Sequence, residues 1–250
     1  MVPGIFADSC FYVNLEDIIK PSNYKGAYLS EVDFISSIHK RTKRDYLARV
    51  NDRDFPKAKA ALLAKKWAFD YWDGDRRVNY GGYKYIPGRW EKVAEELIRH
   101  YKLSNESSVL DVGCGKGFLL FEIKKILPDI KIRGVDVSVY ALENSKPEIK
   151  EFLDEGCASL LPYEDLSFDL AISINTLHNL NNLKLEKAMK EFSRVSKNQY
   201  FCVESYRSEQ EKVNLLYWQV TCEQFNSPEE WEWWMRHSNY SGDYSFIFFE

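Results

Sequence analysis

The sequence predicts an α/β fold in which a doubly wound, mostly parallel sheet of six or seven strands carries helices on both faces. Three observations predict it. Short apolar segments typical of buried strands alternate with amphipathic helical segments from residue 90 onward. A glycine-rich turn links a strand to a helix at Val109–Gly117. With 250 residues, 45% of them hydrophobic, the chain can bury one full core. We expect a helical and aromatic extension over residues 1–89 and the sheet domain over residues 90–250.

Two helices are expected in the extension. Apolar residues at helical spacing predict a helix over Glu31–Val50 and a second over Ala58–Trp72, and a single turn of helix is expected near Leu15–Lys20. The run His39–Arg44 places four Lys or Arg residues within six positions. This run is either a solvated helix face or a site for an anionic substrate or partner.

An aromatic and glycine-rich stretch follows, from Tyr71 to Trp90, with paired charges and no helical or strand period. Aromatic rings can close over a flat or cationic ligand, and glycines allow a close fit. We interpret this stretch as an ordered lid loop over a ligand site, because it leads directly into the helix expected at Trp90–Tyr101. The alternative is an aromatic connection that packs on the core.

A glycine turn organises the sheet domain. The apolar strand expected at Ser107–Val112 is followed by an apolar helix over Phe118–Leu127, and the turn between them contains Gly113, Gly115 and Gly117. Since glycine has no Cβ, the backbone there can turn sharply and lie against a ligand. A strand, a glycine turn and a helix N-terminus together suit the polar end of a nucleotide-like ligand. The spacing is not that of a dinucleotide site, because Phe118 stands where the third glycine would.

The pattern D-x-G-x-G-x-G at Asp111–Gly117 resembles the first motif of class I S-adenosylmethionine (SAM) dependent methyltransferases, whose fold is Rossmann-like. The expected strand Lys131–Val137 resembles their second motif, since Asp136 lies ~20 residues past the last glycine, where an acid can bind both ribose hydroxyls. A third segment, Glu155–Pro162, departs from the family because Cys157 replaces an acid that often receives the adenine amino group. We expect weaker adenine selection there and an unreactive buried thiol.

The segment Ser167–Asn179 resembles the fourth family motif. Phe168–Ile174 is expected to be a buried strand, and the residues after it would lie at the ligand end of the sheet. His178 can take a proton from an attacking hydroxyl or amine, because its unperturbed pKa is ~6.5; the alternative is that it orients the substrate. The resemblance implies a cofactor site made by Arg89, Asp111, Gly113, Cys114, Gly115, Gly117, Asp136, Val137, Cys157, Ala158, Asn175 and Thr176.

The rest of the chain is expected to complete the sheet. A helix over Leu183–Val195 and a strand over Gln199–Glu204 come first, and a helix over Pro228–Arg236 precedes a last strand at Tyr244–Phe249. The family usually closes its sheet with an antiparallel hairpin, whereas only one strand is clear here after the last helix. Either Leu215–Cys222 supplies the missing edge or the sheet has six strands.

The resemblance implies a methyltransferase that transfers a methyl group from SAM to an oxygen or nitrogen of a small acceptor. The flanking segments YWDGDRR, YGGY, GRW and GDYSFIFF are more loosely similar to bacterial methyltransferases of surface-polysaccharide and nucleotide-sugar pathways, which implies a sugar-like or phosphorylated acceptor. Two alternatives remain open: SAM-dependent transfer of a group other than methyl, and a catalytically silent partner or regulatory subunit. Candidate catalytic residues are His178, Tyr83 and Glu204, and candidate substrate contacts are Tyr80, Arg76, Arg77, Tyr206 and Arg207.

Composition narrows the expected partners. The formal net charge of -4 and the pI of about 5.7 give no overall positive field for nucleic acid or an anionic membrane surface. Five widely spaced cysteines without a C-x-x-C pair indicate reduced thiols, and no cluster has metal-ligand spacing, so no metal is expected. With no basic leader and no apolar run of ~20 residues, we expect a cytoplasmic protein that acts without nucleic acid or membrane; a homodimer is left open.

Overall fold

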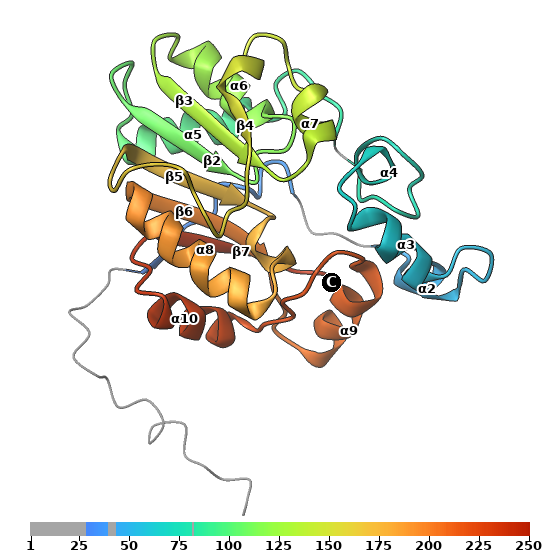
Figure 1. Ribbon diagram of the computed structural model, residues 1–250. Coiled ribbons are helices and arrows are strands. Elements are labelled where there is room, and N and C mark those ends of the chain that lie inside the picture. Colours follow the sequence, from blue (N-terminus) through green and yellow to red (C-terminus); the bar gives the residue numbers. More distant parts are fainter. Residues whose placement is uncertain (1–28, 40–43, 82) are drawn as a thin grey trace, which may run out of the picture.

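The computed structural model describes residues 29–39, 44–81 and 83–250, and these residues form a single seven-stranded sheet (Figure 1). All neighbouring strands run parallel, in the order β1-β7-β6-β5-β2-β3-β4. The α/β class and the doubly wound arrangement are therefore confirmed. The strands are β1 (Ser30–Glu31), β2 (Ser108–Val112), β3 (Lys131–Asp136), β4 (Leu153–Glu155), β5 (Phe168–Ile174), β6 (Ser196–Glu204) and β7 (Asp243–Ile247).

Strands β2 and β5 are neighbours at the centre of the sheet, and the direction of winding reverses between them. The chain continues from β2 through β3 to β4 on one side, and from β5 through β6 to β7 on the other. Both central strands are apolar because helices cover both of their faces; Val109, Leu170 and Ile172 are fully buried. In a doubly wound sheet, such a reversal opens a crevice at the carboxyl ends of the strands. The loops after β2 and β5 border this crevice.

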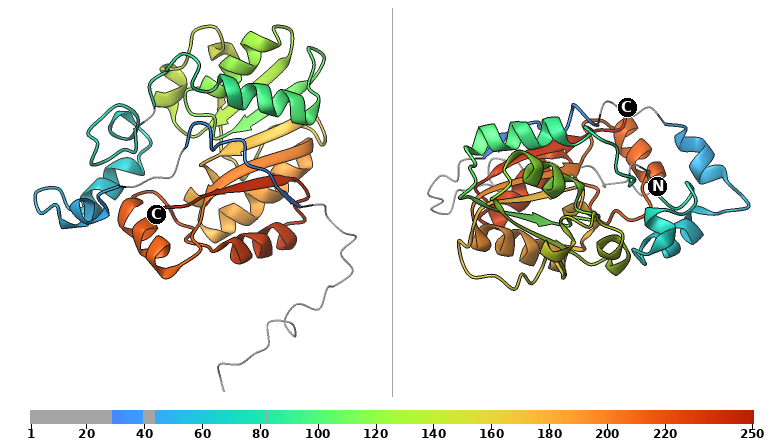
Figure 2. Two further views of the ribbon diagram at one scale, coloured as in Figure 1. Left: turned by 180° about the vertical axis from the view of Figure 1, so that it is seen from behind. Right: turned by 90° about the horizontal axis from the view of Figure 1, so that it is seen from above.

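Helices pack on both faces of the sheet. Apolar side chains of α5 and α6 belong to the core on one face, and those of α8 and α10 belong to the core on the other. Figure 1 shows α8 in front of the sheet, and the view from behind in Figure 2 shows α5 across the opposite face. The helices expected in the sheet domain are thus confirmed: α5 (Glu91–Tyr101), α6 (Phe118–Ile126), α8 (Asn182–Val195) and α10 (Pro228–His237), to which the structure adds α7 (Val139–Glu143) and the short helices η1 (Lys150–Phe152) and η2 (Leu177–Asn179).

The edge of the sheet differs from both expected alternatives. Leu215–Cys222 adds no strand; its first residues end helix α9 (Glu209–Trp218). The seventh strand is β1, which pairs with β7 so that Ser30 lies opposite Asp243. The contact continues past the strand, because the Val32 amide donates to the Tyr244 carbonyl over 2.8 Å. The closing strand β7 is also parallel to β6, so no antiparallel hairpin is present in the described part of the sheet.

The extension is less helical than predicted. The helix expected over Glu31–Val50 is wrong: the segment begins as strand, and among its described residues, 31–39 and 44–50, the one α-helix is α2 (Tyr46–Asn51), capped by the Asp45 side chain. The helix expected over Ala58–Trp72 is divided into α3 (Lys57–Ala64) and α4 (Phe69–Trp72), and Trp67 between them has a φ of 52°. The turn expected near Leu15–Lys20 lies outside the described residues. Figure 1 shows α2, α3 and α4 grouped beside α7 and α9.

Helices α3 and α4 enclose a small apolar cluster of their own. Its buried members are Ala60, Ala64, Tyr71, Val78 and Val220, so it also includes a residue from beyond α9. This cluster fixes the extension against the carboxyl side of the sheet. No helix of the described segments combines the length and the apolar character needed to cross a membrane. The four described cysteines are free thiols.

Candidate active site

A cavity of about 890 Å³ lies at the carboxyl ends of the central strands and is covered by residues of the extension. Its lining comes from the loops after β2, β3, β5 and β6 and from segments around α4 and α9. A cavity of this volume is in the range of small-molecule and cofactor sites. It brings together most of the residues predicted from sequence: Arg76, Tyr80, Tyr83, Arg89, Asp111, Gly113, Cys114, Gly115, Asp136, Val137, Cys157, Ala158, Asn175, Thr176, His178 and Glu204.

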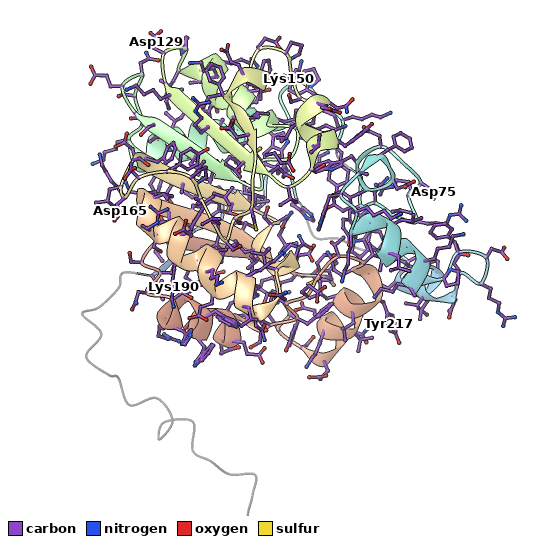
Figure 3. All side chains as sticks on the ribbon, viewed as in Figure 1. Asp75, Asp129, Lys150, Asp165, Lys190 and Tyr217 are labelled. Carbon is purple, nitrogen blue, oxygen red and sulfur yellow. The ribbon has the colours of Figure 1, made fainter. Side chains whose placement is uncertain are left out.

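Three predicted substrate contacts lie outside this lining. Arg77 pairs with Asp75 at 2.6 Å on the outer side of the extension (Figure 3). Arg207 pairs with Glu211, and the Tyr206 hydroxyl donates to Glu230. These side chains have polar partners at the surface, and the structure does not bring them together with the candidate residues that line the cavity.

Gly117, a predicted cofactor residue, also lies outside the lining. It occupies the N-cap of α6 with a φ of 69°, and an added Cβ would lie 2.5 Å from Ile149 Cδ1. Its role is to start the helix, because only glycine adopts this backbone readily in so little space.

The other two glycines of the turn border the cavity in conformations that favour glycine. Gly113 has a φ of 82°, and a Cβ there would lie 2.0 Å from Thr176 Oγ1 in the loop after β5. Gly115 has a φ of 55°, and a Cβ there would lie 2.6 Å from the Trp72 ring. Any side chain at either position would be strained and would fill the space between the loops. The glycine turn therefore allows the backbone of one loop to approach the other closely.

A buried carboxylate follows β3 at the floor of the cavity. Asp136 accepts hydrogen bonds from the Gly115 amide and the Ser138 amide, both over 2.8 Å. The Val137 amide also favours the charged carboxylate, and the two oxygens together still have acceptor capacity for a ligand hydroxyl. Burial raises the pKa of Asp136, and these amides oppose that shift. Burial and the nearby charge of Asp136 raise the pKa of Asp111 to about 8.

Trp72, which sequence reasoning did not single out, lies over this floor. Its indole nitrogen donates to Ser138 Oγ over 2.7 Å, and its ring lies against Gly115. The indole therefore spans the two residues whose amides hold Asp136. The run YWDGD contained the only sequence signal for it, namely an aromatic pair beside a glycine.

Asp73 fastens the lid loop to both sides of the cofactor floor. Lys116 Nζ donates to Asp73 Oδ2 over 2.7 Å, and the Tyr140 hydroxyl donates to the same oxygen over 2.9 Å. Lys116 belongs to the glycine turn, and Tyr140 belongs to α7. The side chain of Lys116 is 7% exposed, so this ion pair is largely shielded from water.

The other end of the cavity holds a buried polar network. His178 Nε2 lies 3.7 Å from Glu204 Oε2, and Gln219 donates through Nε2 to the same oxygen. The Tyr80 hydroxyl donates to Gln219 Oε1 over 2.6 Å and accepts from the amides of Val220 and Thr221. Because those two amides occupy the lone pairs of the hydroxyl, its proton is directed at Gln219, which turns the Gln219 amino group toward Glu204.

Burial sets the protonation of this network. It lowers the pKa of His178 to about 3 and raises the pKa of Glu204 to about 8, while the Gln219 hydrogen bond opposes the second shift. Burial also raises the pKa of Tyr83 well above its usual range. Of the three predicted catalytic residues, Glu204 has the pKa closest to neutral pH, so its ionised form is both basic and appreciably populated there.

Two asparagines bring unpartnered acceptors to the cavity. Asn175 has a φ of 57°, and both Asn175 Oδ1 and Asn179 Oδ1 are buried without a hydrogen-bond partner among the described residues. Both residues line the cavity. A buried acceptor without a donor costs free energy, so these oxygens suit a ligand that carries N–H or O–H groups.

Comparison of the sequence with known proteins identifies a methyltransferase domain. A family model described as a methyltransferase domain matches residues 103–239. A protein of Encephalitozoon cuniculi, whose name assigns it provisionally to the methyltransferases, is 33% identical over 110 residues, which cover 44% of this chain and 48% of that protein. A tRNA (carboxymethyluridine(34)-5-O)-methyltransferase of Arabidopsis thaliana is 32% identical over 130 residues, which cover 51% of this chain and 30% of that protein.

The solved structure of the YcgJ protein from Bacillus subtilis covers 58% of this chain and 66% of its own, with 23% identity and a TM-score of 0.48. The chain spans about half the length of the curated relatives it matches first. One relative is named for action on tRNA. The relatives therefore do not support the expectation that this protein acts without nucleic acid.

Proposed function

The chain belongs to the methyltransferase domain family, and on that premise we propose that it transfers a methyl group from SAM to an oxygen or nitrogen atom of a small acceptor. The observation that carries the proposal is the cavity that joins the glycine turn and Asp136 at one end to Glu204 and His178 at the other. One end has the groups to hold a nucleoside, and the other has a buried base. Their common cavity would place a donor and an acceptor side by side.

The residues at the first end fit SAM. Asp136 would accept from the ribose hydroxyls, and Gly113 and Gly115 leave the backbone open to the methionine part of the cofactor. The unpartnered Asn175 Oδ1 would accept from an ammonium group, and Arg89 would pair with a carboxylate. When bound, SAM supplies a methyl group activated by its cationic sulfur.

At the second end, Glu204 would take the proton of the acceptor. With a pKa raised to about 8 by burial, a useful fraction of Glu204 is ionised near neutral pH, whereas His178 is a weak base at a pKa of about 3. His178 would instead orient Glu204: its Nδ1 accepts the Glu204 amide over 3.5 Å, which leaves the imidazole proton on Nε2, facing the carboxyl group.

The cover over the cavity favours a small acceptor. Trp72, Tyr80 and Tyr83 all line it from the extension, and their rings contact one another or Tyr71. A cavity roofed in this way suits a molecule that enters and is enclosed, of the sugar-like or phosphorylated kind that the flanking segments imply. An RNA acceptor of the kind named for one relative would need the roof to open around a flipped base.

The proposal is tested by calorimetric titration of the purified full chain with SAM and with S-adenosylhomocysteine, followed by incubation with pools of candidate acceptors. Mass spectrometry then searches for an acceptor heavier by one methyl group together with S-adenosylhomocysteine. Binding of both cofactor forms with methyl transfer supports the proposal. Another SAM-derived product would indicate transfer of a different group, and tight binding without transfer to any acceptor would favour a silent partner. Binding of neither form would refute the cofactor assignment.

A further inference from the structure

Three arginines at the mouth of the acceptor end have no carboxylate partner. Arg44 and Arg76 line the cavity, and Arg49 lies beside them against the lining residues Tyr80 and Trp218. Among the described residues, no Asp or Glu lies within ion-pair distance of any of the three. The cavity residue Lys65 pairs with Glu223, and five arginines elsewhere on the surface pair with carboxylates: Arg77, Arg133, Arg194, Arg207 and Arg236. Arg53, Arg89 and Arg99 also have no carboxylate at ion-pair distance among the described residues, so it is the grouping of Arg44, Arg49 and Arg76 beside Tyr80 and Trp218 that matters here.

Trp218 gathers two of these arginines. The guanidinium carbon of Arg44 lies 5.1 Å from the indole centroid of Trp218, and that of Arg49 lies 4.4 Å from it. Arg49 also lies 5.3 Å from the Tyr80 ring centroid. Aromatic faces stabilise the cations at this distance, but they neutralise no charge. Arg49 Nη2 also donates to the Arg77 carbonyl and Arg76 Nη1 to Asn79 Oδ1, both over 3.2 Å; these acceptors are neutral too, so the charge of the guanidinium groups stays available.

The charges of Arg49 and Arg76 are close enough to oppose each other, as are those of Arg49 and Lys57. Burial and then the charge of Arg76 lower the pKa of Arg49, and burial and then the charge of Arg49 lower the pKa of Lys57. Arg49 Nε is buried and has no hydrogen-bond partner among the described residues. Like charges and an orphaned donor both cost free energy, and an anion between them would relieve both costs.

We infer that Arg44, Arg49 and Arg76 form a subsite for a phosphate group carried by the methyl acceptor. The inference rests on the proposed function and narrows its substrate to small phosphorylated molecules. Three guanidinium groups carry more positive charge than a single carboxylate can neutralise, which favours a phosphate group. Their forked N–H donors also match the geometry of phosphate oxygens. The subsite also connects to the base, because the Tyr80 ring beneath Arg49 reaches Glu204 through Gln219. An acceptor anchored by its phosphate would extend along Tyr80 toward Glu204.

The test titrates the full chain, first saturated with S-adenosylhomocysteine, with inorganic phosphate and with pyrophosphate in a calorimeter. We expect pyrophosphate to bind more tightly than phosphate. Arg49→Gln, Arg76→Gln and Arg44→Gln should each weaken pyrophosphate binding by about tenfold or more, since each removes charged hydrogen bonds. Arg49→Lys, which keeps the charge and loses the fork, should give a smaller loss.

Arg53→Gln is the matched control, because Arg53 is an exposed arginine shortly after α2 that does not line the cavity. It should bind pyrophosphate like the natural chain. The affinity of each variant for S-adenosylhomocysteine shows whether it is folded; if Arg49→Gln fails this check, the exposed Arg44 and Arg76 still decide the matter.

Four outcomes would overturn the subsite. The chain could bind neither phosphate nor pyrophosphate, or Arg53→Gln could lose as much pyrophosphate affinity as the subsite variants. Malonate could bind as tightly as pyrophosphate, or a single-stranded RNA oligonucleotide could bind more tightly than pyrophosphate in a way that depends on Arg49. A chain that binds S-adenosylhomocysteine but no phosphate refutes this inference alone. A chain that binds neither SAM nor S-adenosylhomocysteine refutes the proposed function itself.

Discussion

Glu204 and His178 face each other at the acceptor end of the cavity, and burial moves their pKa values in opposite directions. In both cases the shift favours the neutral form, because a site removed from water disfavours charge. The consequence for catalysis differs between them. In the proposed reaction, Glu204 would act as a base matched to mildly alkaline pH, whereas His178, with a proton on one nitrogen and a lone pair on the other, would orient its neighbour.

Replacing Glu204 by Gln should therefore lower methyl transfer by a factor of about 10²–10⁴. With the acceptor in hand, turnover of the natural chain should rise with pH through about 8, because only the ionised carboxylate of Glu204, whose pKa is raised to about 8, accepts a proton. Glu204→Gln should lose this rise. His178→Ala should lower turnover more than it lowers SAM affinity. Turnover by Glu204→Gln at the natural rate would exclude the carboxylate from proton transfer.

Replacing Asp136 by Asn should weaken SAM binding by about 1–3 kcal/mol, since a charged acceptor for the ribose hydroxyls becomes neutral. Calorimetric titration measures the change. Asp154→Asn is the matched control, because Asp154 is exposed beside Arg133 and does not line the cavity. Equal affinities in Asp136→Asn and the control would place the cofactor elsewhere.

The residues of the candidate site were predictable where they lie at the carboxyl end of an apolar strand. Asp111 and Asp136 are in the last two positions of β2 and β3, and Asn175 directly follows β5; these buried strands are visible in the sequence, and parallel strands end at one edge. Trp72 and Gln219 were not predictable: the sequence places Trp72 at the end of an expected helix and Gln219 in a segment that could be an edge strand, and neither pattern indicates a contact with the cavity. Their contacts depend on how distant segments pack, which no local pattern encodes.

Asp73 attaches the lid loop around α4 to the glycine turn and to α7 through Lys116 and Tyr140. Asp73→Asn should remove the ion pair with Lys116 and lower the free energy of local opening by about 1–3 kcal/mol. Amide hydrogen exchange over residues 67–81 should then be faster, and S-adenosylhomocysteine should associate faster, because Trp72 would leave the cofactor floor more often.

Asp75→Asn tests the same loop without the same contact. Asp75 pairs with Arg77 on the outer side of the extension, so this variant should leave exchange near Trp72 unchanged. Equal exchange in both variants would show that the Asp73 contacts do not hold the loop.

Helices and strands were predictable from the sequence when their apolar periodicity extended over enough residues. Strand β5 and helix α8 show several apolar positions at regular spacing, and both appear where expected. Strand β1 has two residues, which is too short for any period. The division between α3 and α4 depends on a left-handed backbone at Trp67, a conformation that a bulky residue adopts only when its surroundings hold it there.

For the molecule as a whole, the buried carboxyl groups predict that stability falls as pH rises. The pKa values of Asp111 and Glu204 are raised to about 8 in the folded chain, so between their ordinary values and about pH 8 the folded chain retains protons that the unfolded chain has lost. On the acid side, the pKa of His178 is lowered to about 3, so the unfolded chain gains a proton first as pH falls below ~6.5.

Urea unfolding of the chain without ligand should thus give a lower free energy of unfolding at about pH 8 than at about pH 6. Glu204→Gln should reduce that difference, since its side chain does not titrate. Lys197→Gln, which removes an exposed partner of Asp169, should leave it nearly unchanged. A difference of the natural size in Glu204→Gln would show that this carboxyl group is not the source.

The pairing of β1 with β7 also has a consequence for the chain while it is being synthesised. Residues 243–247 leave the ribosome after every other strand, so β1 and the outer side of β6 both lack a neighbour until that moment. Unpaired strand edges recruit other chains, and long-range pairing of this kind closes late. A nascent chain with both edges open is therefore exposed to aggregation and to chaperone capture until residues 243–247 have left the ribosome.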